Sequence, residues 1–246
     1  MMIARKIKTI LCGPQKAEKP VPYDMESDKA HIIRAVEPYT MTSPERIYAL
    51  ISAVDYILEQ NIAGDFVECG VWRGGSMLSA IMRLMEKGCT DKTLWLYDTY
   101  EGMPAPDEND YSKRSGPAKD KFEKTKISEN SSDWCFASLE DVQANIALAK
   151  YPADKIHFIK GKVEDTLPAQ APQTIALLRL DTDWYASTKH ELEHLFPCLV
   201  SGGILIIDDY GHWEGCRKAV DEYFTGHAQK PLLVRVDYTG RIGIKP

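Results

Sequence analysis

Five short apolar runs, separated by segments with helical periodicity, constrain the fold more than any other feature of this 246-residue sequence. A chain in which strands and helices alternate in this way forms a parallel sheet covered by helices. The predicted strands span 65–70, 93–97, 156–159, 175–180 and 203–207, and the predicted helices span 44–60, 77–87, 138–149, 186–199 and 214–224. Two last strands, 232–236 and 241–244, predict an antiparallel edge. The expected fold is therefore α/β, a doubly wound and mostly parallel sheet.

Carboxylates stand directly after two of these runs. Asp181 follows the fourth predicted strand, and Asp208 and Asp209 follow the fifth. Because the carboxyl ends of parallel strands open onto one crevice, we expect the three side chains to lie together. Their mutual repulsion calls for a hard divalent cation or for protonation of one carboxyl, and nothing basic lies beside the pair until Arg217 and Lys218. We predict a metal site, and the alternative for any single aspartate is a helix cap.

A glycine-containing turn follows the first predicted strand, where residues 68–76 read Glu-Cys-Gly-Val-Trp-Arg-Gly-Gly-Ser. Glycines at such a turn let bare backbone N–H groups approach a ligand near the start of a helix. The spacing is closer to the E/D-x-G pattern of nucleoside-binding sheets than to a dinucleotide fingerprint. Asp98 ends the second strand, where a carboxylate can accept hydrogen bonds from ribose hydroxyls. The alternatives are a tight turn that needs glycine for steric reasons and a capping or solvated aspartate.

The remaining polar residues of interest are Asp183 and the histidines. Asp183, just before the helix at 186, is expected to cap that helix. The six histidines are expected to form no ligand cluster, with His190 and His194 on a polar helix face, while His212 is a possible site residue because it follows the aspartate pair. The sequence contains neither a G-x-S-x-G elbow nor a G-x-x-x-x-G-K-[ST] loop, which argues against the corresponding hydrolases and kinases.

Composition excludes several functional classes. The formal net charge is −6 and the isoelectric point about 5.6, which argues against a nucleic-acid-binding face. The six cysteines, including Cys12, are scattered without a C-x-x-C pair, which favours reduced thiols and a cytoplasmic location over a zinc site or a disulfide framework. No apolar stretch is long enough to span a membrane, and the basic start, 1–12, lacks the features of a signal peptide.

The chain is expected to divide into an N-terminal arm and helix, 1–60, and a main domain, 61–246. Residues 13–40 are rich in proline and charge, which predicts an irregular arm or loop. The long segment 105–137 predicts a lid over a binding site. This lid is locally basic, which indicates a solvated mobile loop or, alternatively, contact with an anionic acceptor; its cations are Lys113, Arg114, Lys119, Lys121, Lys124 and Lys126.

Five motifs in order resemble the macrocin O-methyltransferase family, which includes mycinamicin and novobiocin sugar methyltransferases. The similarity runs from about Thr40 to Phe224. The motifs are Phe66 to Gly75, Asp98 to Pro104, Asp165 to Pro168, Leu180 to Thr188, and Gly202 to Tyr210. The resemblance implies a Rossmann-like class I methyltransferase that uses S-adenosylmethionine and Mg²⁺ to methylate a sugar hydroxyl of a natural product or glycan.

The resemblance also implies roles for individual residues. Asp181, Asp208 and Asp209 would bind the metal, and Asp181 would be the general base. The cofactor would contact Thr40, Met41, Glu68, Cys69, Gly70, Val71, Trp72, Ser76, Asp98, Thr99, Tyr100, Val163, Glu164, Asp181 and Thr182.

Two alternative functions are a catechol-type O-methyltransferase acting on an aromatic diol and a non-catalytic cofactor-binding scaffold. The family resemblance also implies a homodimer or larger homo-oligomer.

Overall fold

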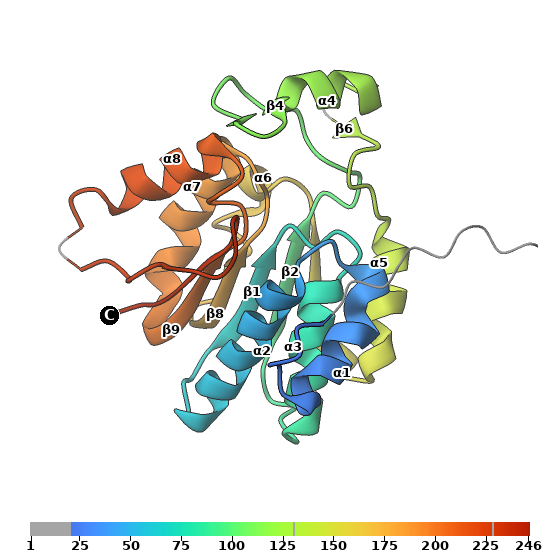
Figure 1. Ribbon diagram of the computed structural model, residues 1–246, viewed down its shortest axis with the longest axis vertical. Helices are drawn as coiled ribbons and strands as arrows, with labels where there is room; N and C mark the ends of the chain where they lie inside the picture. Colours follow the sequence, from blue (N-terminus) through green and yellow to red (C-terminus); the bar gives the residue numbers. More distant parts are fainter. Residues whose placement is uncertain (1–20, 130, 228) are drawn as a thin grey trace, which may run out of the picture.

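A computed structural model describes residues 21–129, 131–227 and 229–246, and it confirms the predicted sheet (Figure 1). The strand order is β10-β11-β9-β8-β1-β2-β7. The five central strands run parallel, while β11 is antiparallel to both β9 and β10. Their bounds are β1 Asp65–Cys69, β2 Leu94–Asp98, β7 Ile156–Lys160, β8 Ile175–Leu180, β9 Leu199–Ile207, β10 Val234–Arg235 and β11 Arg241–Ile244.

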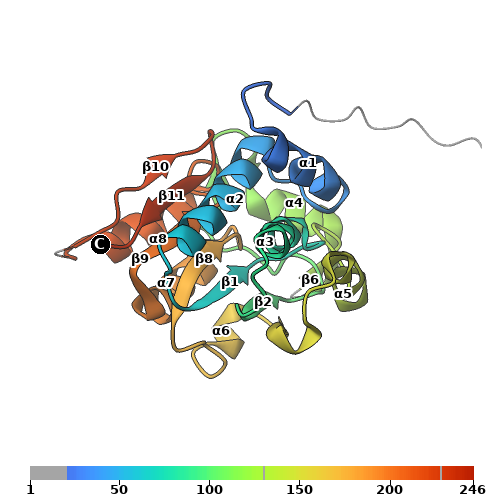
Figure 2. The ribbon, with the colours of Figure 1, turned by 90° about the horizontal axis from the view of Figure 1, so that it is seen from below.

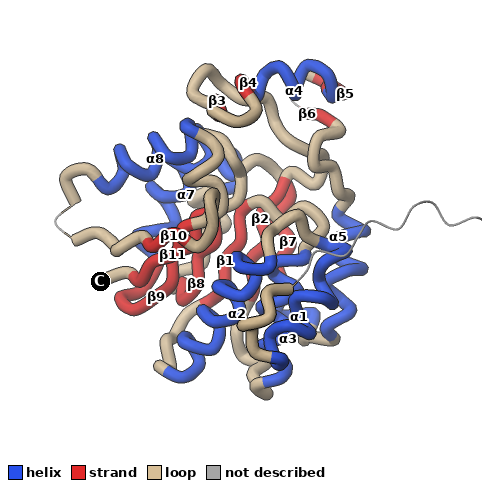
Figure 3. The backbone as a smooth tube through the Cα atoms, viewed as in Figure 1, coloured by secondary structure: helices blue, strands red, loops and turns tan. Residues whose placement is uncertain are grey.

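Helices cover both faces of this sheet (Figures 2 and 3). One face carries α1 Ser27–Val36, α2 Pro44–Glu59, α3 Gly75–Glu86 and α5 Leu139–Ile146, and the other carries α6 Val163–Thr166, α7 Tyr185–Leu195 and α8 Glu214–Phe224. The start of α2 follows the predicted signal, because Pro44 is its first residue and the Ser43 hydroxyl accepts a hydrogen bond from the Arg46 N–H. Short 3₁₀ turns, 37–39, 147–149, 153–155 and 196–198, complete the connections.

Alternating side chains along the strands build two hydrophobic cores. On β1, Phe66 packs with α2 and α3, whereas Val67 packs with the aromatic residues of the opposite layer. All six residues of β8 are buried, as expected for a strand at the centre of a parallel sheet. This burial includes Arg179, a charged residue in an otherwise apolar strand.

The prediction of an irregular segment over 13–40 is wrong for its described part. Residues 27–36 form α1, and a 3₁₀ turn follows over 37–39. Ile32, Ile33 and Val36 are buried against the core shared by α2 and α3, so packing stabilises a helix whose charged and proline-containing flanks obscured its apolar stripe. The basic start 1–12, including Cys12, lies outside the described residues, and the other five cysteines form no disulfide.

The lid, defined here as residues 105–137, has secondary structure of its own and stands above the carboxyl ends of the parallel strands (Figure 1). It contains two small hairpins and a helix: β3 Tyr111–Ser112, β4 Gly116–Pro117, α4 Ala118–Thr125, β5 Lys126–Ser128 and β6 Ser131–Ser132. Trp134, near the end of the lid, packs edge-on against Trp184, with the ring centroids 5.4 Å apart. The centroid of the Trp134 ring lies 6.1 Å from that of the Trp213 ring. Three buried indoles therefore attach the lid to the loops that follow β8 and β9.

Within 21–129, 131–227 and 229–246, no helix combines the length and apolar character needed to cross a bilayer.

Candidate functional site

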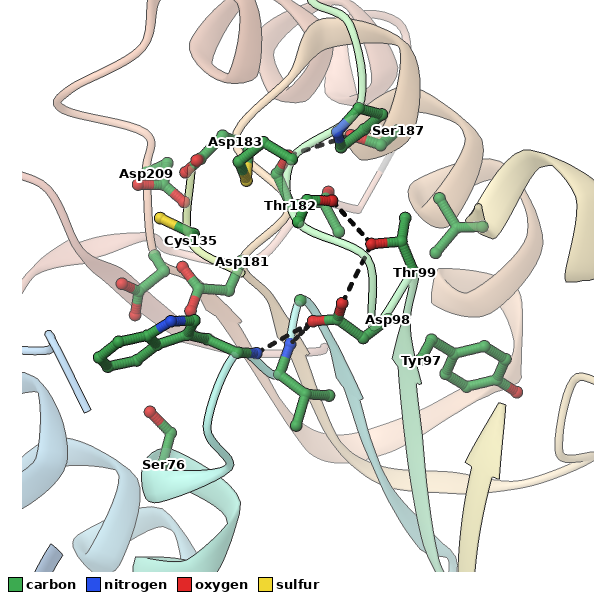
Figure 4. Close-up of a pocket in the computed structure, with 18 of the residues that line it drawn as sticks. Ser76, Tyr97, Asp98, Thr99, Cys135, Asp181, Thr182, Asp183, Ser187 and Asp209 are labelled. Atoms are coloured by element: carbon green, nitrogen blue, oxygen red, sulfur yellow. Dashed lines mark hydrogen bonds between the residues drawn. The ribbon is translucent and has the colours of Figure 1, made fainter. Parts of the chain in front are cut away.

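A pocket opens at the carboxyl ends of β1, β2, β8 and β9, where the strand order places the ligand crevice (Figure 4). Most residues that the sequence assigned to a cofactor line it. They are Thr40, Met41, Gly70, Val71, Trp72, Ser76, Asp98, Thr99, Val163, Glu164, Asp181 and Thr182. Asp208 and Asp209, assigned to the metal, line the same pocket.

Three predicted cofactor residues do not line the pocket. Glu68 and Cys69 are fully buried in β1, and Tyr100 is buried with its hydroxyl donating to the Leu96 carbonyl at 3.0 Å. Cys69 packs in the core between the sheet and α7, where burial raises the pKa of its thiol. These side chains support the walls of the pocket from behind.

Asp98 holds the glycine-containing turn in place. Its Oδ2 accepts hydrogen bonds from the N–H groups of Val71 at 2.7 Å and Trp72 at 3.0 Å (Figure 4). Its Oδ1 accepts the N–H of Tyr100 at 2.8 Å. One carboxylate therefore joins the end of β2 to the turn after β1, so the two predicted nucleoside-binding features form a single unit.

Gly70 is required by close approach as well as by its backbone conformation. Its φ is +82°, and a Cβ at this position would lie 2.0 Å from the carbonyl oxygen of Asp181. The turn after β1 therefore packs directly against the end of β8. This contact brings the glycine turn and the acidic residues into one cavity.

The three predicted metal ligands come together as expected. Asp181, Asp208 and Asp209 each offer a carboxylate oxygen, and these oxygens lie within 4.8 Å of one another. Asp208 and Asp209 are buried, whereas Asp181 is half-buried at the cavity wall. Neighbouring parallel strands β8 and β9 produce this arrangement, because the Asp208 N–H donates to the Leu180 carbonyl at the shared end of the ladder.

No basic residue follows the Asp208–Asp209 pair closely in the sequence, but the fold brings two arginines to the acidic residues from other elements. Arg179 Nη2 lies 2.8 Å from Asp181 Oδ2 and 2.7 Å from Asp208 Oδ1. Its Nη1 lies 2.7 Å from Glu68 Oε1. Arg46, from α2, forms an ion pair with the other oxygen of Asp208. The guanidinium groups offset part of the negative charge and fix the carboxylates' orientation.

The site nevertheless retains more negative charge than its two arginines balance. Burial raises the pKa of Glu68, Asp181 and Asp183 to about 7 each, against the opposing effect of Arg179 on the first two. Burial and the neighbouring Asp183 carboxyl raise the pKa of Asp209 well above its usual range. Asp209 Oδ2 is also buried with no hydrogen-bond partner among the described residues. An acceptor-only oxygen in this position fits a hard cation.

Asp183 is a member of this acidic group, so its prediction as a helix cap is wrong. Trp184 occupies the N-cap position of α7, and no side chain there accepts a capping hydrogen bond. Asp183 has a φ of +70°, which is uncommon for a residue with a Cβ, and its carboxyl lies beside that of Asp209. The strained backbone turns this side chain into the pocket, where Figure 4 shows it next to Cys135.

The histidines are distributed differently from the prediction. His190, Glu193 and His194 on α7 bring potential ligand atoms within 4.8 Å of one another, so the expectation of no histidine cluster is wrong. None of the three lines the pocket. His212 does not line it either, but its Nδ1 is hydrogen-bonded to the Tyr238 hydroxyl just beyond the Asp208–Asp209 pair.

Several residues that line the pocket were not predicted from the sequence, because only tertiary packing brings them to it. They are Tyr39, Thr42, Arg46, Tyr97, Gly102, Met103, Pro104, Cys135, Gly161, Lys162, Asp183 and Ser187. Arg46 sits among apolar residues of a helix, and only its position one turn after the cap could have indicated that it faces the strand ends. Cys135 reaches the pocket only because the lid folds back over it.

Asp110 attaches the tip of the lid to α7. Asp110 is 2% exposed. Its carboxylate accepts one hydrogen bond from the N–H of Tyr185, the first residue of α7, at 2.8 Å, and another from the N–H of Asp107 at 2.7 Å. The lid therefore supplies the N-terminal cap that α7 lacks locally. Burial raises the pKa of this carboxyl from 3.8 to about 6, because two backbone donors only partly compensate for desolvation.

This shift predicts a pH dependence of stability. Because the folded state binds this proton more tightly than the unfolded state, the contribution of Asp110 is fully present below pH 3.8 and is lost as pH rises through about 6. The wild type should lose stability relative to Asp110→Asn across this window, as measured by urea unfolding at several pH values. The exposed Asp120→Asn serves as the control. Parallel pH curves for the wild type and Asp110→Asn would contradict the assignment.

Comparisons with known proteins agree with this geometry. The family model described as macrocin-O-methyltransferase matches residues 14–242. The chain is 34% identical over 202 residues to the 8-demethyl-8-(2,3-dimethoxy-alpha-L-rhamnosyl)-tetracenomycin-C 4'-O-methyltransferase of Streptomyces olivaceus, covering 82% of this chain and 74% of that protein. It is 32% identical to the mycinamicin III 3''-O-methyltransferase of Micromonospora griseorubida, with 82% and 76% covered. The solved structure of the O-methyltransferase NovP is similar with a TM-score of 0.72 and 30% identity, covering 84% of this chain and 82% of that one.

Proposed function

The chain belongs to the macrocin O-methyltransferase family and is an O-methyltransferase, and we propose that it methylates a sugar hydroxyl with S-adenosylmethionine and Mg²⁺. The observation that carries the proposal is that the glycine turn with Asp98 and the acidic trio line one pocket. The relatives named above carry names of methyltransferases for sugar-bearing natural products, which favours a sugar as the acceptor.

The donor would occupy the part of the pocket between the glycine turn and Asp98. Gly70 lines this part of the pocket where the turn packs against Asp181, and Val163 and Glu164 line it from α6. Asp98 is fixed by the N–H groups of Val71 and Trp72 on Oδ2 and of Tyr100 on Oδ1. The second lone pair of Oδ1, which now accepts only the Thr99 hydroxyl at 3.4 Å, would accept a ribose hydroxyl. Met41, at the opposite rim, is 54% exposed and lies where a ligand would enter.

Asp181, Asp208 and Asp209 would hold the cation. The buried, unpartnered Oδ2 of Asp209 and the carboxylate ligand set fit Mg²⁺. When bound, S-adenosylmethionine would supply the methyl group and Mg²⁺ would lower the pKa of the acceptor hydroxyl. Asp181 would accept the hydroxyl proton, because its side chain is 25% exposed, whereas Asp208 and Asp209 are 2% and 9% exposed. The lid would exclude water from the acceptor.

Calorimetric titration with S-adenosylmethionine and S-adenosylhomocysteine tests the donor part of this proposal. The wild type should bind both, and Asp98→Ala should bind each about 10- to 100-fold more weakly, because charged hydrogen bonds to the turn and ligand are lost. The exposed Asp120→Ala should bind like the wild type. If the wild type binds neither form, with or without Mg²⁺, the proposed function is wrong.

Homo-oligomerisation, which the family resemblance implies, and a cytoplasmic location, which the scattered cysteines favour, remain predictions. Light scattering of the purified chain tests the first of them.

A further inference from the structure

Four of the six cations of the lid have partners that distinguish them. Lys113 pairs with Glu214 at 3.3 Å, and Lys126 pairs with Glu123 at 3.7 Å. Arg114 and Lys121 have no carboxylate within 4.0 Å among the described residues, and each lies over an aromatic ring. Their charge is therefore held in place by packing without being neutralised.

The rings that hold these two cations do not line the pocket themselves, but each is attached to a segment beside it. The Arg114 guanidinium lies 4.6 Å from the centroid of the Tyr238 ring, and the Tyr238 hydroxyl is hydrogen-bonded to His212. The Lys121 ammonium lies 4.0 Å from the centroid of the Trp134 ring. The turn that carries Tyr238 is fixed to the loop after β9, because the Gly211 N–H donates to the Thr239 carbonyl at 2.8 Å. Trp134 immediately precedes Cys135, which lines the pocket.

The rings that hold the two cations belong to one connected series of aromatic contacts. Between ring centroids, Trp134 lies 6.1 Å from Trp213, Trp213 lies 4.7 Å from His212, and His212 lies 5.8 Å from Tyr238. Trp213 and His212 follow the Asp208–Asp209 pair directly in the loop after β9, so both cations lie toward the acidic side of the site. From this position their positive charges would attract an anionic ligand bound there.

From this arrangement we infer that the acceptor is an anionic sugar, carrying a phosphate or carboxylate group that Arg114 and Lys121 bind while a hydroxyl reaches Asp181. The inference rests on the proposed function and adds the class of its acceptor. Arg114 offers a planar set of donors that matches the oxygens of either anion, and Lys121 adds a second positive charge. A neutral glycoside would leave both charges unused, and an amino sugar would be repelled.

The exposed position of Tyr238 supports this assignment. Tyr238 is 38% exposed as a whole residue although Arg114 and His212 both contact its ring, so part of this side chain is open to a ligand. Trp134, Trp184 and Trp213 are nearly inaccessible and serve to attach the lid. The accessible aromatic surface and the unpaired cations therefore lie on the same side of the site, where a sugar ring and its anionic group would bind together.

The test is calorimetry on the protein saturated with S-adenosylhomocysteine and Mg²⁺. The ligands are hexose 1-phosphates, nucleoside diphosphate hexoses, uronic acid methyl glycosides and the matching neutral methyl glycosides. At least one anionic form should bind about tenfold or more tightly than its neutral partner, and rising salt should weaken it. The two phosphate-bearing sets and the uronic acids distinguish the two sources of negative charge.

Arg114→Gln/Lys121→Gln should lose about 10- to 100-fold in affinity for that anionic ligand, with little change for the neutral glycoside. The control variant Lys119→Gln/Lys124→Gln also removes two positive charges, but from positions on α4 that lie over no described ring. It should bind the anionic ligand like the wild type. Equal binding of all anionic and neutral forms, or equal loss in both double variants, would overturn the inference. A failure of the proposed function would differ, because S-adenosylhomocysteine itself would not bind.

Discussion

Replacing Asp181 with asparagine should reduce the rate of methyl transfer by about 10²- to 10⁴-fold, the usual contribution of a general base. The change removes the charge at the end of β8 but keeps a similar volume, and the amide oxygen can still accept the hydrogen bond that Arg179 donates at 2.8 Å. The fold should therefore persist. Binding of S-adenosylhomocysteine, measured by calorimetry, should change little because Asp98 and the glycine turn are unaffected.

Asp209→Asn provides a matched comparison, because it removes a proposed metal ligand without removing the proposed base. Its Oδ2 is the buried oxygen without a partner, so its replacement should weaken divalent-cation binding most directly. Raising the Mg²⁺ concentration should restore part of the rate of Asp209→Asn and little of the rate of Asp181→Asn. Metal affinity is read independently of activity from the binding of Mn²⁺. Wild-type turnover by Asp181→Asn would exclude this residue as the base.

The position of the acidic trio could be predicted from sequence because topology determines it. Once β8 and β9 are parallel neighbours, the residues that follow them must meet at one edge of the sheet. The same logic placed Asp98 beside the glycine turn, and the structure joins them by hydrogen bonds to Val71 and Trp72. Strands and helices with strong periodicity were predictable for a similar reason, since their apolar spacing reflects which faces are buried.

The partners of the acidic residues could not be predicted in the same way. Arg46 reaches Asp208 from a helix distant in sequence, and spacing along the chain carries no information on that approach. Arg179 did leave a signal, because a single arginine within a continuous apolar strand is almost never buried without a partner. The lid is attached through the edge-on and tilted packing of Trp134 against Trp184 and Trp213, which only the tertiary structure brings together.

Arg179→Met should destabilise the protein by about 3–5 kcal/mol, because removing one partner leaves buried carboxylates uncompensated. Arg179 is 2% exposed and contacts Glu68, Asp181 and Asp208 at 2.7–2.8 Å. Urea unfolding of the wild type and the variant measures the difference. Burial raises the pKa of Glu68 to about 7 although Arg179 opposes the shift, so removing the guanidinium should raise that pKa further. The variant should then lose stability relative to the wild type as pH rises above about 6, where the wild-type carboxyl begins to ionise.

A double-mutant cycle with Glu68→Gln separates this interaction from the packing of the arginine side chain. If the buried charge of Glu68 causes the loss, Glu68→Gln/Arg179→Met should be more stable than the sum of the two single changes predicts, by about 1–3 kcal/mol. Arg179→Lys adds a second comparison, because an ammonium group restores the charge but lacks the planar donors that contact three carboxylates at once. It should recover part of the stability while leaving Mn²⁺ binding impaired. If the effects of the two single changes on the free energy of unfolding simply add, Arg179 acts through packing. If Arg179→Lys binds Mn²⁺ as tightly as the wild type, the Arg179 guanidinium does not orient the carboxylates.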